Sequence, residues 1–230
     1  MAAEQGHSGL SSSLTDLMTS LAVIFILLLV ASLNNAQQEG EMTRNAILLK
    51  LQEKLQTELK DYKDRGFEVK NDPKDPLGLI VLVPEGLLNF EVNSAVIPAK
   101  GTEFLQTIIP KMSSTVCSAD FKSDINSIVV EGHTDSSGTD ERNLPLSHER
   151  SMAVVQDSLK ILEKGQAIND RTCFLNFLSA TGRGSVEPVL DESGNEDRNR
   201  SRRVIFKIRV TSLEQRMIKK ISSTPEQDIK

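Results

Sequence analysis

A polar, glycine-rich stretch holds the side chains of this sequence that are best suited to bind a small charged ligand. It runs from Gly132-His-Thr-Asp135 to Arg150, with Ser147 between them. A carboxylate and a guanidinium that face one pocket recognise a zwitterion, because Asp135 would hold an ammonium group and Arg150 would hold a carboxylate. An ordinary ion pair between a loop and a helix explains the same spacing equally well.

Asp16 is a second residue suited to chemistry, because it stands at the entrance of a long uncharged segment. Residues 17–38 carry no charge, and as a helix they would span about 33 Å, close to the roughly 30 Å hydrocarbon core of a bilayer. An acid at membrane depth costs about 2.5 to 3.5 kcal/mol. Asp16 is therefore either an ion-binding carboxylate, with Thr15 and Thr19 as hydroxyl neighbours, or a helix N-cap in the headgroup region.

The composition fits one membrane segment followed by one water-soluble domain. The 230 residues include 27 basic and 32 acidic side chains, for a net charge of −5, and the mean hydropathy is −0.25. Such a chain is too polar for a multi-spanning membrane protein and too apolar for a disordered one. A cleaved signal peptide is disfavoured because residues 1–16 lack Lys and Arg. The negative charge also argues against nucleic-acid binding by the arginines at 198–203.

A charged, helix-favouring stretch follows the apolar segment. Apolar residues recur at spacings of three and four from Ile47 to Tyr62, which predicts an amphipathic helix over 45–62. Glu58 interrupts the heptad pattern, so a long coiled coil is not supported. The role of this helix stays open between a plug, a short dimer contact, a helix lying on another surface and a spacer. Turn residues at 71–76 then mark a domain boundary.

Beyond these turn residues the sequence alternates between short apolar runs and helical patterns. This alternation predicts an α/β sandwich in which helices pack on one mixed sheet. The predicted strands cover residues 77–83, 125–130, 174–180 and 204–210, and the predicted helices cover 98–112 and 144–162. We divide the chain into an N-terminal tail (1–13), a transmembrane helix (14–36), an amphipathic linker (37–76), the α/β domain (77–213) and a C-terminal tail (214–230).

The motif around Asp135 resembles the signature of a known family. Gly132-His-Thr-Asp135, Asn143, Leu146-Ser147 and Arg150 resemble the G-H-T-D…N…L-S…R pattern of the OmpA-like peptidoglycan-binding domain. The resemblance extends over roughly residues 77–211, through Phe90–Gly101, Gly182–Gly184, Pro188 and Arg202–Val204.

This resemblance implies non-covalent binding of the meso-diaminopimelate of cell-wall peptides. Asp135 and Arg150 are then the two ligating residues. The residues expected to support them are Gly132, His133, Thr134, Asn143, Leu146, Ser147 and Arg202.

The N-terminal segment resembles a second family. Residues 14–29 are similar to the transmembrane helix of MotB-type stator subunits, whose Asp near the cytoplasmic entrance carries the permeating ion. This resemblance favours the ion-translocating role of Asp16. The short tail, the single helix, the amphipathic segment and the compact domain together resemble most closely the ZorB family of the Zorya antiphage defence system. A flagellar MotB-type stator subunit and a passive cell-wall tether are the alternatives.

The resemblance implies an ion-driven motor subunit in the bacterial inner membrane. A homodimer of the chain would stand inside a ring, expected to be a pentamer, of a ZorA-like or MotA-like partner that spans the membrane several times. The N-terminus would be cytoplasmic and the domain periplasmic, which overrides the weak opposite indication from Arg44 and Lys50 behind the helix. We expect the translocated ion to be a proton rather than sodium, and we expect no cofactor.

Enzymatic activity and metal binding are not expected. The sequence has neither a G-x-S-x-G motif nor a clear pair of catalytic acids, and His133, Asp135 and His148 lack the usual spacing of zinc ligands. Cys117 and Cys173 are an even count in a chain assigned to an oxidising compartment. Each precedes a predicted strand, and neighbouring parallel strands start at the same end of a sheet, so a disulfide between them is geometrically plausible.

Overall fold

The computed structural model describes residues 7–61, 66–83, 86–165 and 168–212, together with residues 215 and 218. Tyr62, most of the C-terminal tail and the start of the N-terminal tail lie outside the described residues. The chain forms two compact units, Met1–Thr43 and Arg44–Lys230.

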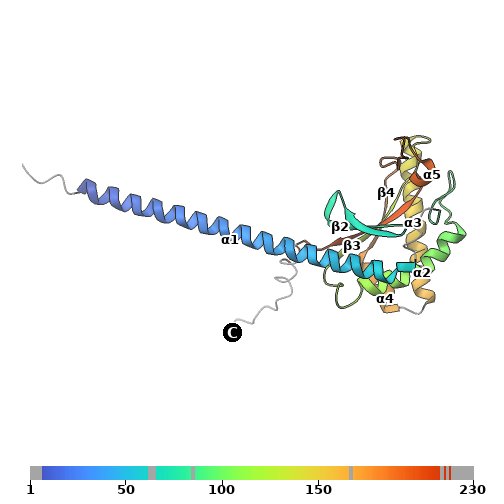
Figure 1. The fold of residues 1–230 in the computed structure, drawn as a ribbon, viewed down its shortest axis with the longest axis horizontal. Helices are drawn as coiled ribbons and strands as arrows, with labels where there is room; N and C mark the ends of the chain where they lie inside the picture. The colour runs from blue at the N-terminus through green and yellow to red at the C-terminus, as the bar shows by residue number, and fades with distance from the viewer. Residues whose placement is uncertain are drawn as a thin grey trace, which may run out of the picture. The chain divides into compact units, whose positions relative to one another are not determined.

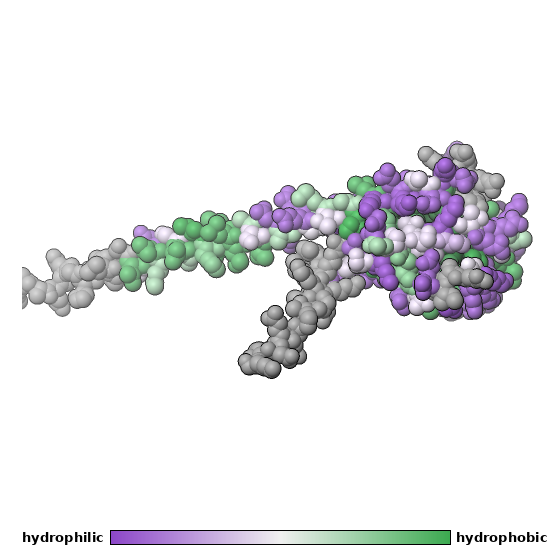
Figure 2. All heavy atoms as spheres, turned by 90° about the horizontal axis from the view of Figure 1, so that it is seen from below, coloured by the Kyte–Doolittle hydropathy of each residue, from purple (hydrophilic) through white to green (hydrophobic). Residues whose placement is uncertain are grey.

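The first unit consists, in its described part, of the N-terminal portion of one long helix. Helix α1 runs from His7 to Glu58. From Leu14 onward it is long and apolar enough to cross a membrane: its most apolar window has a mean hydropathy of 2.4, and none of that window is buried. Figure 2 shows these apolar side chains as one continuous stretch along the helix. This exposure suits a helix that is surrounded by lipid rather than by water.

The second unit is built on one sheet with helices packed on it, as predicted, but the sheet has five strands where four were expected. The strand order is β1-β2-β5-β3-β4. β3 and β4 are parallel and the other neighbours are antiparallel, so the sheet is mixed. The strands are β1 (Glu68–Asp72), β2 (Asp75–Leu82), β3 (Ile125–Gly132), β4 (Leu178–Gly182) and β5 (Val204–Val210).

Helices pack on this sheet and enclose the hydrophobic core (Figure 1). They are α2 (Ala99–Val116), α3 (Asp140–Lys164), α4 (Ile168–Phe177) and the short α5 (Arg198–Ser201). Alternation along each strand separates the core from the polar face. On β5, for example, Phe206 and Ile208 are buried in the core, whereas Lys207 between them forms ion pairs with Asp72 and Glu131.

The amphipathic segment packs against the core of the second unit. Leu48, Leu51, Leu55 and Leu59 all belong to the core cluster, and the Lys111 ammonium donates a hydrogen bond to the carbonyl oxygen of Glu58 over 2.9 Å. The turn residues predicted at 71–76 form the hairpin between β1 and β2. The residues between 44 and 76 therefore share a compact unit with the α/β domain.

The predicted strand at 174–180 is wrong in its first half. Residues up to Phe177 belong to α4, and β4 begins only at Leu178. A short apolar run does not by itself distinguish a buried helix from a strand. Here Phe174 enters the core from a helix, and the neighbouring Cys173 forms a disulfide with Cys117 at the end of α2. The disulfide thus links two helices, not the starts of two strands.

Candidate functional site

Two glycines bring the start of α3 onto the ends of β3 and β4. A Cβ atom on Gly132 would lie 2.0 Å from the carbonyl oxygen of Ser147, and one on Gly182 would lie 2.6 Å from the Ser147 hydroxyl oxygen. Only glycine allows backbones to approach this closely. The contact places the loop at 133–139 at the carboxyl end of β3, next to the first turns of α3.

Ser147 lies inside α3 and joins this helix to the segment that follows β4. Its hydroxyl donates to the carbonyl oxygen of Leu144 over 2.7 Å and accepts from the Gly184 N–H over 2.9 Å. α3 begins at Asp140, four residues before the predicted start. Asp140 and Glu141 occupy its first turn, where acidic side chains stabilise the positive end of a helix.

A cavity of about 170 Å³ lies among this loop, α3 and the segment around Asn93. Asp135 and Arg150 both line it, so the structure brings the two predicted ligating residues to one cavity. Thr134, Asn143, Leu146 and Arg202 line it as well, whereas Gly132, His133 and Ser147 do not. The other lining residues are Val92, Asn93, Ser137, Gly138 and Arg142.

Asp135 is a buried carboxylate that carries its charge. One oxygen lies 2.6 Å from an Arg202 nitrogen, and the other accepts the Ser137 N–H over 3.0 Å. Burial acts to raise the pKa of Asp135, but the hydrogen bonds from Arg202 and Ser137 hold that pKa below its ordinary value. A carboxylate oxygen accepts more than one hydrogen bond, so Asp135 retains acceptor capacity toward the cavity.

Arg150 is buried and forms hydrogen bonds to two segments beside the cavity. Its guanidinium donates to three carbonyl oxygens, at 2.9 Å to Ser94 and at 3.0 Å to both His133 and Glu91. It also lies over the Phe90 ring, 5.2 Å from the centroid. Burial lowers the pKa of Arg150 to about 10, so the side chain remains a cation at neutral pH. Each terminal nitrogen keeps a second N–H beyond these bonds.

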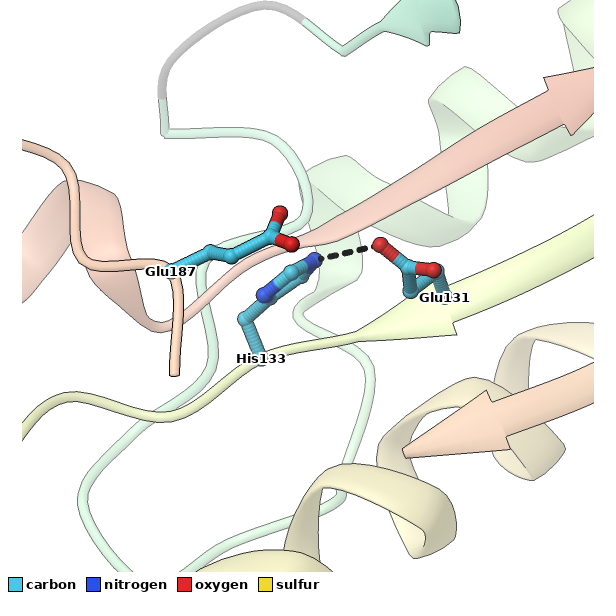
Figure 3. A group of neighbouring side chains, drawn as sticks. All are labelled: Glu131, His133 and Glu187. Carbon is cyan, nitrogen blue, oxygen red and sulfur yellow. Dashed lines mark ion pairs between the residues drawn. The ribbon is translucent and has the colours of Figure 1, made fainter. Parts of the chain in front are cut away.

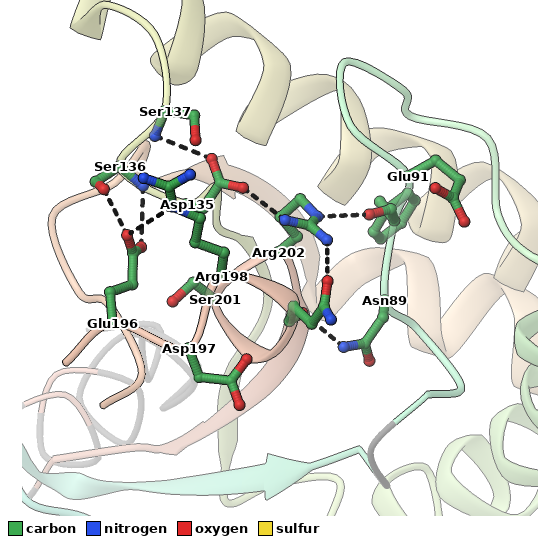
Figure 4. A network of polar contacts seen from close by, with 12 residues as sticks. Asn89, Glu91, Asp135, Ser136, Ser137, Glu196, Asp197, Arg198, Ser201 and Arg202 are labelled. Atoms are coloured by element: carbon green, nitrogen blue, oxygen red, sulfur yellow. Dashed lines mark hydrogen bonds and ion pairs between the residues drawn. The ribbon is translucent and has the colours of Figure 1, made fainter. Parts of the chain in front are cut away.

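Arg202 connects Asp135 to the far side of the site (Figure 4). Besides the Asp135 pair, it donates to the Phe90 carbonyl oxygen over 3.1 Å and to the Asn199 side chain. The loop itself is anchored through Ser136, whose N–H donates to Glu196 over 2.9 Å. Arg202 thus holds the Asp135 carboxylate, and Glu196 holds the loop that carries it.

Thr134 contributes an unsatisfied polar group. It is 2% exposed, it lines the cavity, and its hydroxyl has no hydrogen-bond partner among the described residues. A buried polar atom without a partner is costly, so a ligand that bonds this hydroxyl would relieve that cost. Asn143 directs its amide to the Asp135 carbonyl oxygen over 3.4 Å, which supports the loop.

His133 belongs to a separate buried cluster. Its ring lies between the carboxylates of Glu131 and Glu187, with Nε2 3.2 Å from Glu131 (Figure 3). Among the described residues, this is the one group of three that could hold a metal ion, and it includes neither Asp135 nor His148. The chain's own cations already pair with both carboxylates: Lys207 lies 3.0 Å from Glu131, and Lys74 lies 2.6 Å from Glu187.

Asn93 and Arg142, which were not predicted as site residues, also line the cavity and contact each other. The Arg142 Nε donates to the Asn93 side-chain oxygen over 3.3 Å. Asn93 has a φ of 58°, a left-handed conformation that Asn tolerates better than most residues. Arg142 directly precedes Asn143 of the motif, and this position is the one feature of the sequence that points to it.

Asp16 lies inside α1. The helix begins at His7, so Asp16 is not its N-cap. The Thr19 hydroxyl donates to the carbonyl oxygens of Thr15 and Asp16, at 3.0 and 2.9 Å. Thr19 therefore bonds to the helix backbone in this structure rather than to the Asp16 carboxylate.

Comparisons with known proteins agree with this architecture. The OmpA family model matches residues 89–202. A Zorya protein ZorB from Escherichia coli strain ATCC 8739 is 30% identical over 217 residues, which cover 88% of each chain. The chain belongs to the ZorB family. A second ZorB relative, from Escherichia coli O139:H28, is 28% identical over 87% of this chain and 80% of its own.

The fold of this ZorB family member also matches a solved structure. The periplasmic domain of Helicobacter pylori MotB aligns with a TM-score of 0.50 and 20% sequence identity, over 71% of this chain and 93% of that domain. The likeness concerns the fold. The predicted combination of an apolar N-terminal helix and an OmpA-like α/β domain is confirmed.

Proposed function

We propose that this chain is the cell-wall-anchored stator subunit of a Zorya-type antiphage defence motor. In this proposal the apolar part of α1 crosses the inner membrane, Asp16 carries the translocated ion, and the α/β domain holds a diaminopimelate-containing wall peptide. The ZorB-named relatives favour defence over a flagellar role. The observation that carries the wall-binding part is the shared cavity of Asp135 and Arg150.

The cavity supplies complementary partners for one zwitterionic centre. The carboxylate oxygens of Asp135 can accept hydrogen bonds from an ammonium group, and the remaining N–H groups of Arg150 can donate to a carboxylate. The Thr134 hydroxyl offers one more contact. The volume of about 170 Å³ lies below that of typical drug-sized sites. It therefore suits the charged end of a peptide side chain rather than a whole peptide.

Binding to purified peptidoglycan sacculi tests this part. The full chain in detergent is sedimented with sacculi, in competition with the soluble tripeptide L-Ala-γ-D-Glu-meso-diaminopimelate. We expect Asp135→Asn to weaken binding at least about tenfold, because the ammonium loses its charged partner. Asp120→Asn is the matched control, since that exposed carboxylate pairs only with Lys50 among the described residues. Equal binding by the Asp135→Asn variant and the wild type contradicts the assignment.

The ion-carrying part rests on the place of Asp16 in an exposed apolar helix. Because Asp16 is not a helix cap, capping does not explain a charged residue at the entrance of the proposed membrane segment. A partner ring that encloses the helix would shield the carboxylate from lipid and let it bind and release the ion. One charge that crosses 100 mV supplies about 2.3 kcal/mol, comparable to the cost of burying the acid. A dimer inside a pentameric ring, with a cytoplasmic N-terminus, completes the proposal.

Asp16→Asn separates a motor subunit from a passive tether. The full chain and its genomic neighbours are purified together in mild detergent, and the same cells are challenged with phage. We expect a multi-spanning partner to co-purify with both forms, and only the wild type to protect. If the variant protects as well as the wild type, Asp16 carries no ion. If no partner co-purifies either, the chain is a wall tether.

A further inference from the structure

Arg142 is an exposed arginine at the rim of the wall-binding cavity that the proposed function leaves without a role. It lies in the first turns of α3 and lines the cavity together with Arg150 and Arg202. Three guanidinium groups and one carboxylate, that of Asp135, thus line the cavity. A site of this charge balance favours a ligand with more negative than positive charge.

The three arginines differ in what already holds them. Arg202 pairs with Asp135 at 2.6 Å, and Arg150 donates to three carbonyl oxygens. Arg142 makes one neutral contact, at 3.3 Å to Asn93. No carboxylate among the described residues lies within ion-pair distance of Arg142. Its charge is therefore the least compensated of the three.

The Asn93 contact gives Arg142 a defined position. Asn93 stands on the opposite wall in a left-handed conformation, and its amide oxygen receives the Nε–H of Arg142. The terminal nitrogens of the guanidinium then have N–H groups left that match the two oxygens of a carboxylate. The Arg142 side chain is exposed at the edge of the cavity, whereas Asp135 and Arg150 are buried in it.

We propose that Arg142 binds a second carboxylate of the wall peptide and so selects acidic peptides over their amidated forms. This inference rests on the proposed wall-binding function. Asp135 and Arg150 would hold the ammonium and the carboxylate of one diaminopimelate centre. Arg142 would hold the carboxylate of the other centre. A carboxamide at that second position presents no charge and only one acceptor atom, so it loses this bidentate contact.

Calorimetric titration of the full chain in detergent tests the inference. The probes are L-Ala-γ-D-Glu-meso-diaminopimelate with the second diaminopimelate carboxylate free, and the same peptide with that carboxylate as a carboxamide. We expect the wild type to bind the acid about five- to tenfold more tightly than the amide. Arg142→Gln should bring the ratio of the two dissociation constants close to one, with little change for the amide. Lys160→Gln is the control, because it removes an exposed positive charge farther along the same helix.

The outcomes separate the two proposals. If the wild type binds both peptides equally, or if Arg142→Gln keeps the preference, the role of Arg142 is overturned while wall binding stands. If the wild type binds neither peptide, the wall-binding function fails and the inference fails with it. A higher salt concentration should weaken binding of the acid peptide more than binding of the amide peptide, because ions screen an exposed guanidinium.

Discussion

The side chains that hold the cavity come from segments far apart in the sequence. Asp135 and Arg150 lie on one strand-loop-helix unit, but Arg202, the partner of Asp135, lies 67 positions farther along the chain. The guanidinium of Arg150 likewise reaches back to carbonyl oxygens at Glu91 and Ser94. The geometry of the site therefore depends on the complete domain, although its two principal residues belong to a single motif.

His133 gives the domain a pH-dependent stability. Burial lowers the pKa of His133, and nearby Arg203 acts in the same direction, against the opposing effects of Glu131 and Glu187. The unfolded chain, with an ordinary histidine pKa of about 6.5, therefore binds this proton more readily than the folded chain. The contribution of His133 to stability is complete above about pH 7 and falls as the pH drops through about 6.5 toward the folded pKa.

Urea denaturation of the full chain in detergent checks this expectation. The unfolding midpoint, followed by circular dichroism, should drop between about pH 7.5 and about pH 5.5, and His133→Gln should reduce that drop. Carboxylates such as Glu187, whose pKa the Lys74 hydrogen bond helps to lower to about 2, lose their contribution only at lower pH. His148→Gln replaces an exposed histidine on α3. This variant should show the same drop of the unfolding midpoint as the wild type. An unchanged drop in His133→Gln contradicts the assignment.

At the scale of elements, the contact between β3 and α3 sets the position of the site. We expect Gly132→Ala to destabilise the domain by about 2 kcal/mol or more, because the new methyl group would meet the Ser147 carbonyl oxygen at 2.0 Å. It should also abolish sacculus binding, since α3 must move away from the strand. Unfolding midpoints and sedimentation with sacculi measure both effects.

Gly165→Ala is the matched control for this change. Gly165 follows α3 with a φ of −73°, and the nearest atom to a Cβ there lies at 3.4 Å. An ordinary contact and an ordinary φ make alanine acceptable at this position. Equal effects of the two substitutions would show that the close approach at Gly132 has no special importance.

Most elements of the α/β domain could be predicted because their apolar spacing is regular. The strand at Val204–Val210 agrees in both limits, and β2, β3, α2 and α3 differ only at their ends. β1 was not predicted, since it is an edge strand of charged residues with Val69 as its one fully buried apolar side chain. The border between α4 and β4 was misplaced because the core, not the local pattern, decides the conformation of Phe174.

Asp135, Arg150 and Arg202 could be predicted as site residues, but the contacts that join distant segments could not. Asp135 and Arg150 reach one cavity because a strand end and the following helix start are neighbours in space. No local pattern indicates that Arg202 pairs with Asp135 or that Asn93 faces Arg142, since these contacts depend on how the sheet is assembled. His133 also belongs to the motif, yet its ring is buried beneath the loop instead of lining the cavity.

For the molecule as a whole, the unit that contains the cavity begins in α1, at Arg44. Leu51 is fully buried in the core, whereas Leu49 on the same helix is 61% exposed. We expect Leu51→Ala to lower the free energy of unfolding by about 3 kcal/mol and Leu49→Ala to change it by less than about 0.5 kcal/mol. Urea denaturation of the two full-length variants measures the difference. Equal effects would mean that this helix does not contribute to the folded domain in solution.

The disulfide between Cys117 and Cys173 also has a mechanical consequence. The two cysteines are 56 positions apart, and Asp135 and Arg150 both lie between them in the sequence. A pull applied to the chain outside this loop passes through the sulfur–sulfur bond. The enclosed residues, which would span about 190 Å if fully extended, therefore cannot be drawn out. Pulling on the two ends of the chain can therefore extend only the residues outside this loop.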